Sequence, residues 1–282
     1  SYDNATKPRF TYGYGANGQA AYVRDSELNR TVWTEYDTSE RPTRVHVLEG
    51  ATGSSVGTPK YVSEVKYDQF GNVEEIDEQI NNQGITLNTY YSYDDENRVV
   101  DVICDEDNRI IAYTYDAIGN PLTYDGWTFT WKTGRMLASM VKNGTNAQFT
   151  YDHNGLRIRK IVNGVTTNYT LNGKNVVHMT QGSNDLHFFY DNQGRPAKVK
   201  YNGAMYTYLH NLQGDIVGII DSNGMLVVEY KYNAWGTILS KTGSMAGSLG
   251  YRNPFRYRGY IYDEETWMYW LRDRYYYPEL HR

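Results

Sequence analysis

A short unit built on the dipeptide Tyr-Asp recurs along this chain of 282 residues and constrains its fold more than any other feature. In each unit an alternating strand pattern ends in Tyr-Asp, Gly follows three residues after the Asp, and Asn or Arg often comes next. Successive units are commonly about 20 residues apart, which is the spacing of a supersecondary repeat and far shorter than a domain. The clear copies are Tyr67, Asp68 and Gly71; Tyr115, Asp116 and Gly119; Tyr151, Asp152 and Gly155; and Tyr190, Asp191 and Gly194. Degenerate copies begin at Tyr36, Tyr93, Trp131, His210 and Tyr232.

Each unit predicts a β-hairpin. The alternation before a turn, as in Phe149-Thr150-Tyr151, has the period of two expected of a strand with one buried face. The Asp side chain can accept hydrogen bonds from backbone amides two residues on, and the Gly can take the positive φ that closes the turn. A strand pattern then resumes, as over residues 157–161.

A second kind of turn lies between these units. Asn-Gly is the strongest short signal for a two-residue hairpin turn, because both positions tolerate left-handed dihedral angles. Two turn types in alternation would place loops on opposite edges of one meander. These dipeptides begin at Asn143, Asn163, Asn172, Asn202 and Asn223.

The chain is therefore predicted to be all-β, with repeated β-hairpins that form a continuous spiralling antiparallel sheet, either an open barrel or a hollow shell. Its composition agrees, because 29 tyrosines and 26 glycines supply the aromatic and turn residues that hairpins favour. Sheets twist as they grow, so a ribbon of this length should curl.

Charge and cysteine content exclude several classes of function. A formal net charge of −5 gives no basic surface of the kind that nucleic-acid-binding proteins need, so nucleic acid is not an expected partner. The single cysteine, Cys104, excludes an intramolecular disulfide and offers no metal-finger spacing. No apolar run approaches the roughly 18 residues of a membrane span. The N-terminus has no signal-peptide pattern, but we expect the chain to begin within a longer protein, so this says nothing about secretion.

Two patterns that resemble functional motifs are interpreted as structural. Residues 13–18 fit the glycine spacing of a dinucleotide-binding loop, but strand patterns rather than a helix follow them. The acidic runs 94–96 and 105–107 lack the spacing of a calcium-binding EF-hand, and turn formation accounts for them.

Histidine and tryptophan leave alternatives open. The histidines are dispersed; a zinc site could assemble from them in space, although scattered polar residues on strands are far more common. Exposed tryptophans could stack on sugars, whereas packing in a core or wall is the usual role of such rings. The sequence thus predicts no catalytic, cofactor-binding or metal-binding residue. The histidines are His46, His153, His178, His187, His210 and His281, and the tryptophans considered are Trp33, Trp127, Trp131 and Trp235.

The most specific pattern is the run from Arg252 to Tyr276. It contains Asn-Pro-Phe-Arg-Tyr-Arg-Gly-Tyr-Ile-Tyr-Asp from Asn253 and Leu-Arg-Asp-Arg-Tyr-Tyr from Leu271. With the repeats, this run resembles the Rhs/YD-repeat family, which includes bacterial Rhs and wall-associated polymorphic toxins, the C component of insecticidal toxin complexes and the teneurin YD shell. The residues matched to the family's core-associated motif are Pro254, Phe255, Arg256, Tyr257, Gly259, Tyr260, Asp263, Leu271, Arg272, Arg274 and Tyr275.

Three positions depart from the family pattern. The family usually has Gly where this chain has Trp267, Asp where it has Tyr277, and Gly where it has His281. A bulky Trp at a turn glycine would be strained. Toxin members of the family also continue into an Asp-Pro-x-Gly segment at which an aspartyl autoprotease frees the C-terminal cargo. That segment does not occur in this sequence, so neither self-cleavage nor a toxin payload is assigned to any residue.

The resemblance implies a hollow β-shell that encloses a partner or its own C-terminal effector. Residues 1–250 are predicted to form a YD-repeat hairpin shell, and residues 251–282 a truncated core-associated segment. We expect a non-enzymatic structural segment of an exported protein, extracellular or at the cell surface, without a cofactor. Its partner would be a C-terminal effector or toxin domain, or an enclosed polypeptide. The competing hypothesis is a cell-surface adhesion or carbohydrate-binding β-module whose partners are surface glycans.

Overall fold

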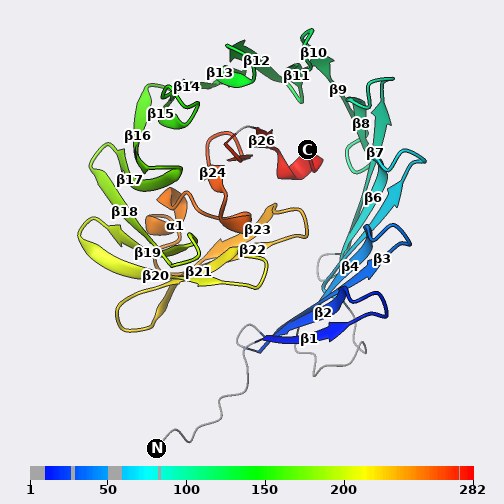
Figure 1. Ribbon diagram of the computed structural model, residues 1–282, viewed down its shortest axis with the longest axis horizontal. Coiled ribbons are helices and arrows are strands. Elements are labelled where there is room, and N and C mark those ends of the chain that lie inside the picture. The colour runs from blue at the N-terminus through cyan, green and yellow to red at the C-terminus, as the bar shows by residue number, and fades with distance from the viewer. Residues whose placement is uncertain (1–9, 27–28, 50–58, 82–83, 273) are drawn as a thin grey trace, which may run out of the picture. The chain divides into compact units, whose positions relative to one another are not determined.

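Antiparallel strands in meander order dominate the computed structural model (Figure 1). It describes residues 10–26, 29–49, 59–81, 84–272 and 274–282. The chain divides into two compact units, residues 1–112 and 113–282.

The first unit contains a nine-stranded sheet in which every strand pairs with its neighbours in the sequence. Its strands are β1 (Phe10–Tyr14), β2 (Ala20–Asp25), β3 (Arg30–Tyr36), β4 (Pro42–Glu49), β5 (Tyr61–Tyr67), β6 (Val73–Ile80), β7 (Ile85–Tyr93), β8 (Val99–Cys104) and β9 (Arg109–Ala112). The glycine-rich residues 13–18 form the end of β1 and most of the turn to β2, so a strand follows them.

The second unit contains a fourteen-stranded meander followed by a small three-stranded sheet. The meander comprises β10 (Thr114–Tyr115), β11 (Pro121–Tyr124), β12 (Trp127–Lys132), β13 (Met136–Lys142), β14 (Thr145–Tyr151), β15 (Arg157–Val162), β16 (Val165–Asn172), β17 (Asn175–Gln181), β18 (Asn184–Tyr190), β19 (Pro196–Tyr201), β20 (Ala204–His210), β21 (Ile216–Ile220), β22 (Leu226–Tyr232) and β23 (Ile238–Thr242). After it come α1 (Leu249–Arg252), the 3₁₀ turn η1 (Tyr257–Gly259), β24 (Ile261–Asp263), β25 (Met268–Trp270), β26 (Tyr275–Tyr276) and the 3₁₀ turn η2 (Pro278–Leu280). We call residues 249–282 the C-terminal segment.

The prediction of an all-β fold built from antiparallel hairpins is confirmed. The ladder is nevertheless interrupted at Tyr113, where β9 ends the first sheet and β10 begins the second. Only one residue separates these two strands, too few for the turn that would fold them side by side. The described strands therefore form two large meanders rather than one uninterrupted sheet.

The core of the second unit lies between the meander and the C-terminal segment. Leu186, Val199 and Ile219 of the sheet are fully buried in this core. Phe255 of the C-terminal segment packs edge-on against Phe188, with 4.9 Å between the ring centroids. Burial of this face stabilises both the strands and the segment, because neither could bury its apolar side chains alone.

Contacts with the C-terminal segment require the fourteen-stranded sheet to curl. Tyr124 of β11 contacts Met268, and Lys241 of β23 pairs with Glu264. In a flat sheet, twelve spacings of about 4.8 Å would place β11 and β23 about 58 Å apart. Met268 and Glu264 are four residues apart, so their Cα atoms lie within about 14 Å of each other. Figure 1 accordingly shows β24 and β26 inside the curve of β10–β23.

None of the helices in the described part of the chain has the length and hydropathy that a membrane crossing requires.

Candidate functional site

The Asp of each repeat organises a five-residue turn. In the turn after β5, Oδ1 of Asp68 accepts hydrogen bonds from the backbone N–H of Phe70 at 2.9 Å and of Asn72 at 2.8 Å. Oδ2 accepts another from the Asn72 side chain at 3.0 Å. Gly71 closes the turn with a φ of 87°, a left-handed conformation that costs glycine little. One carboxylate thus satisfies two backbone donors and fixes the Asn72 side chain, which directly precedes the return strand β6.

The same bonds recur in the other repeats. The Oδ1 atoms of Asp116, Asp152 and Asp191 each accept from the backbone N–H groups two and four residues on. In the degenerate copy at Tyr232, the Asn233 side chain accepts from Trp235 and Thr237 in the same way. The turn therefore needs a side-chain oxygen at this position, and either Asp or Asn supplies it.

A β-bulge accompanies each of these hairpins at the residue that precedes the turn. At Tyr151 the register shifts, so that Thr150 pairs with Arg159 and Tyr151 pairs with Arg157. Ile158 is left without a partner across the strand, and the shift places Arg157 and Lys160 together in the buried interior. Equivalent shifts occur between the residue pairs 35/36, 66/67, 92/93, 114/115, 130/131, 170/171, 189/190, 209/210 and 231/232.

The Tyr of a repeat ties its hairpin to the preceding one. The Tyr67 hydroxyl donates a hydrogen bond to the carbonyl oxygen of Pro42, the first residue of β4, at 2.8 Å. Five more described residues make the equivalent bond to the first or second residue of an earlier strand: Tyr36 to Ala20, Tyr93 to Val73, Trp131 to Pro121, Tyr190 to Val176 and Tyr232 to Ile216. Tyr151 differs, because its hydroxyl lies 3.1 Å from that of Tyr275 in the C-terminal segment.

Asp263 anchors the C-terminal segment to the sheet. Its Oδ2 accepts from Nη1 of Arg157 at 2.6 Å, and its Oδ1 accepts from Nη2 of Arg157 at 3.0 Å and from Nζ of Lys160 at 2.9 Å. Lys160 also pairs with Glu265 at 2.6 Å. Two cations from β15 thus meet two carboxylates of the C-terminal segment, and the Asp263 and Arg157 side chains are 1% and 0% exposed.

Electrostatic effects keep these buried groups ionised. Burial alone would raise the pKa of Asp263, but Arg157 and Lys160 lower it below its usual value. Burial would also lower the pKa of Lys160, yet Asp263 raises it above that of an ordinary lysine. The Arg157 guanidinium lies 4.6 Å from the ring centre of Trp270 and also approaches Phe149. The charges are therefore paired, as buried ions must be.

A second ionic cluster lies beside the first. Glu264 Oε1 accepts from Arg256 at 2.9 Å and from Lys241 of β23 at 2.6 Å. Arg256 is fully buried, and it also donates to the backbone oxygens of Gly250 and Asn253. The consecutive acids 263–265 thus hold β15, β23 and the start of the C-terminal segment together.

The structure gives the predicted core-associated residues different environments. Pro254, Phe255, Arg256 and Asp263 are buried, while Tyr260 is exposed. The hydroxyl of Tyr257 donates to the carbonyl oxygen of Ala234, Gly259 has a φ of 68°, and Tyr275 contacts Arg157. Leu271 is half-buried, whereas Arg272 and Arg274 are exposed.

Sequence reasoning missed the partners of the core-associated residues. They are Arg157, Lys160, Lys241, Glu264 and Glu265. The signal that could have found them is the run of three acids that starts at the last residue of β24, since so many carboxylates beside an apolar strand require cations nearby.

The structure also describes the three positions that depart from the family pattern. Trp267 and His281, where the family has Gly, both adopt left-handed backbone conformations, with φ of 59° and 60°. Trp267 closes the turn between β24 and β25, and its backbone N–H donates to the carbonyl oxygen of Asp263. Tyr277 is buried, and its hydroxyl donates to Asp125 at 3.2 Å. The two glycine positions therefore keep the conformation that glycine favours.

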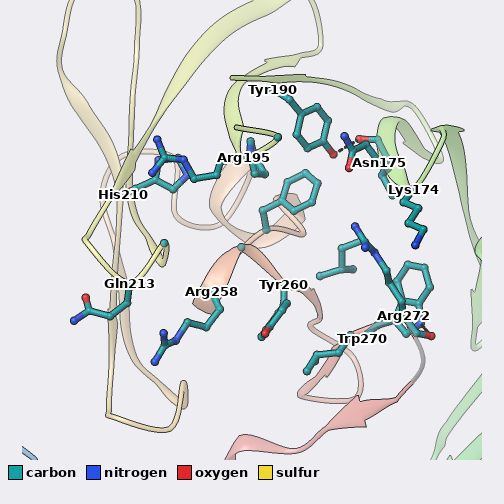
Figure 2. A pocket seen from close by; sticks show the side chains of 18 residues that line it. Lys174, Asn175, Tyr190, Arg195, His210, Gln213, Arg258, Tyr260, Trp270 and Arg272 are labelled. Carbon is teal, nitrogen blue, oxygen red and sulfur yellow. Dashed lines mark hydrogen bonds between the residues drawn. The ribbon is translucent and has the colours of Figure 1, made fainter. Parts of the chain in front are cut away.

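A cavity of about 430 Å³ lies between the C-terminal segment and strands β17 to β20. Figure 2 shows Lys174, Arg195, Arg258 and Arg272 around it, with the rings of Tyr190, Tyr260 and Trp270. Arg195 pairs with Asp191, whereas neither Lys174 nor Arg272 has a carboxylate partner among the described residues. Arg258 lies 4.0 Å from Asp215, so Lys174 and Arg272 supply the positive charge at the cavity that no described carboxylate pairs with, and this charge suits acidic groups.

The tryptophans considered as sugar platforms are packed against other residues. Trp127 is buried, and the indole N–H of Trp131 donates to the carbonyl oxygen of Pro121. Trp33 stacks obliquely on Tyr22, and Trp235 on His281. Among the histidines, the structure brings His178 and His187 together, with their ring centroids 4.2 Å apart.

Several known proteins resemble this chain. The tRNA3(Ser)-specific nuclease WapA of Bacillus spizizenii and the tRNA nuclease WapA of Bacillus subtilis strain 168 are each 35% identical to it over 224 residues, which is 77% of this chain and 9% of each relative. The tRNA(Glu)-specific nuclease WapA of Bacillus subtilis subsp. natto is 36% identical over 174 residues. The chain thus spans about a tenth of the length of these relatives or less.

A crystal structure of TcdB2-TccC3 aligns with 96% of this chain and 18% of that chain, with a TM-score of 0.49 and 15% sequence identity. The family model described as the teneurin YD-shell matches residues 54–208, more than half of the chain. With its Tyr-Asp hairpins, this family match and the 35% identity to the WapA nucleases, the chain belongs to the teneurin YD-shell family, within the Rhs/YD-repeat proteins.

Proposed function

We propose that this chain is a non-enzymatic wall segment of an exported Rhs/YD-repeat toxin, and that the wall encloses a C-terminal effector polypeptide. The observation that carries the proposal is the fixation of the C-terminal segment inside the curve of the second sheet by Asp263, Arg157 and Lys160. The residues 1–250 would form the hairpin wall, and residues 251–282 the core-associated segment that leads inward.

The repeats supply a wall that can extend without a separate core for each hairpin. The repeat turns are fixed by the side-chain oxygen of their own Asp or Asn, and repeat tyrosines such as Tyr67 bond to an earlier hairpin, in this case to Pro42. Stability then comes from contacts between neighbours, which is the usual energetics of repeat proteins. Such a wall can be long while it remains only one sheet thick.

The C-terminal segment supports an inward path for the polypeptide. Residues 275–282 lie on the same side of the second sheet as its buried face, and the Tyr277 hydroxyl bonds to Asp125 there (Figure 1). A polypeptide that followed residue 282 would therefore start inside the curve. The positively charged cavity beside Lys174 and Arg272 offers such a polypeptide a contact for acidic side chains.

The relatives support the kind of effector. They are named as tRNA nucleases, and the region shared with this chain is a small part of each. With a net charge of −5, this chain has no overall positive charge to attract tRNA, so we assign any nuclease activity to the effector and none to the wall.

Protease protection tests this proposal. In the complete protein that contains this chain, a nonspecific protease should leave the effector intact, and should digest it once mild denaturant opens the wall. The 282-residue chain alone should neither cleave tRNA nor bind a glycan array. Three results would each contradict the proposal. The effector could be digested as fast in the complete protein as in its free form. The chain alone could turn over tRNA, or it could bind glycans and lose that binding when tryptophans are replaced by alanine.

A further inference from the structure

A His-Asp-His cluster lies on the face of β17 and β18 opposite the core. His178 of β17 and His187 of β18 are cross-strand partners, and Asp185 precedes His187 by two residues, so it shares the same face. The adjacent pair, Met179 and Leu186, is buried in the core on the other face. The three polar side chains therefore share a solvent-accessible patch on a rigid hairpin.

Their donor atoms converge. Nε2 of His178 lies 2.5 Å from Oδ1 of Asp185, and Nε2 of His187 lies 3.1 Å from Oδ2. The two imidazole rings stack, with 4.2 Å between centroids and 13° between planes. All three ligand atoms lie within 4.8 Å of one another.

We propose that His178, Asp185 and His187 bind a divalent transition-metal ion of the zinc class. Imidazole nitrogen and carboxylate oxygen are ligands that Zn²⁺ prefers, and three protein ligands leave one position of a tetrahedral ion for water or a partner's group. Ligand bonds of about 2.0–2.1 Å place ligand atoms about 3.4 Å apart. The cluster is already close to that separation, so side-chain rotation alone can admit the ion.

The three side chains have room to rotate, while the backbone that carries them is held in place. The three side chains are 30%, 47% and 45% exposed, so they can move without disturbing the core. The backbone N–H of Asp185 donates to the Asn202 side chain at 2.9 Å, which fixes its position on the strand.

Charged and polar neighbours tune the affinity. Lys200 of β19 is the cross-strand partner of His187, and Thr170 of β16 is that of His178. A cation beside the site weakens binding of a second cation, so removal of Lys200 should strengthen it.

Metal titration of the chain tests the site. The chain, with any histidine tag removed and metals stripped, is titrated with Co²⁺ by visible absorption and with Zn²⁺ by calorimetry at pH 7.5. We expect one ion per chain and a tetrahedral cobalt spectrum. His178→Ala and His187→Ala should each weaken binding at least about tenfold, because each removes a ligand. Asp185→Asn should also weaken it, and Lys200→Gln should leave it equal or tighter.

Matched controls separate the site from general effects. His153→Ala removes an exposed histidine from another turn and should bind as the wild type does. Saturating Zn²⁺ should raise the Tm of the wild type, because the ion binds only the folded state. It should not raise the Tm of the double variant His178→Gln/His187→Gln, whose fold is checked by circular dichroism. The absence of saturable binding, or equal affinity in wild type and both alanine variants, would overturn the proposal. Neither of these two binding results depends on whether the chain forms part of a wall that encloses an effector.

Discussion

Nη1 of Arg157 lies 2.6 Å from Oδ2 of Asp263, although 106 positions separate the two residues in the sequence. Both side chains are buried, and Lys160 completes the charge balance. This contact joins the wall to the segment that lies against it.

Replacement of Asp263 should be the most destabilising single change at this contact. Asp263→Asn keeps the size of the side chain but leaves Arg157 buried without a counter-charge, which typically costs about 3–5 kcal/mol. Glu265→Gln is the matched control, because Glu265 is 22% exposed and water can replace its charge. It should cost about 1 kcal/mol or less. Urea unfolding monitored by fluorescence measures both, and similar losses for the two variants would contradict the assignment.

The same contact predicts loss of stability in acid. Arg157 and Lys160 outweigh burial and lower the pKa of Asp263 in the folded state, so the carboxylate stabilises the fold fully above its unfolded-state pKa of about 4. That contribution disappears as the pH falls through the lowered folded-state pKa. The free-energy difference between wild type and Asp263→Asn should therefore shrink below about pH 4. A difference that stays constant from pH 6 to pH 2.5 would exclude this linkage.

The turn at Asp191 should require a side-chain oxygen. Asp191→Ala removes the acceptor for the backbone N–H groups of Gln193 and Arg195, and should cost about 1–2 kcal/mol. Asp191→Asn retains that oxygen, as Asn233 does naturally, and should cost distinctly less. Thermal unfolding ranks the variants, and equal Tm values for them would show that the oxygen has no role.

The tyrosine bond between hairpins can be tested at Tyr232. Tyr232→Phe leaves the carbonyl oxygen of Ile216 without this buried donor, and should cost about 1–2 kcal/mol. Tyr206→Phe is the control in the same sheet, because the Tyr206 hydroxyl has no hydrogen-bond partner in the described part of the chain. Chemical denaturation should detect a loss only for the first variant.

Trp267 should be replaceable with a gain in stability. Its φ of 59° costs an L-residue about 1–2 kcal/mol, and its side chain is 49% exposed. Trp267→Gly should raise the Tm by a few degrees, whereas Trp267→Ala keeps the strained conformation and should not. A glycine variant that melts below the alanine variant would show that the indole contributes more than the strain costs.

Local chemistry made much of the fold predictable from the sequence. Many of the hairpins follow from Tyr-Asp and Asn-Gly turns whose hydrogen bonds span five residues or fewer, as in Asp68 to Asn72. The Asn-Gly turn predicted at Asn223 is wrong, because Asp221 organises a five-residue turn there and accepts from the backbone N–H groups of Asn223 and Met225. The pairing of neighbouring strands follows from the short turns. The interruption of the sheet at Tyr113 was not predictable from the sequence. Only this one residue separates β9 from β10, and the local pattern of residues looks like that of a single continuous strand.

The charge network could not be deduced in the same way. A lysine or arginine on a strand is usually exposed, and the bulge at Ile158 that brings Arg157 and Lys160 together leaves no clear mark in the sequence. The contact with Asp263 is set by the curl of the sheet, which only tertiary packing decides. The departures at Trp267 and His281 could be located from the family pattern, since glycine there implies a positive φ.

The distance between β12 and β23 tests whether the C-terminal segment holds the fourteen-stranded sheet in its curve. Spin labels at Thr128→Cys on β12 and Thr242→Cys on β23, in a Cys104→Ser background, report how far apart these strands lie. Eleven spacings in a flat sheet would separate the two strands by about 53 Å. We predict one narrow distribution well below that distance, which broadens and lengthens when Asp263→Asn is added. A wild-type distribution near or beyond 53 Å, or one unchanged by Asp263→Asn, would contradict the claim that the C-terminal segment holds the wall in its curve.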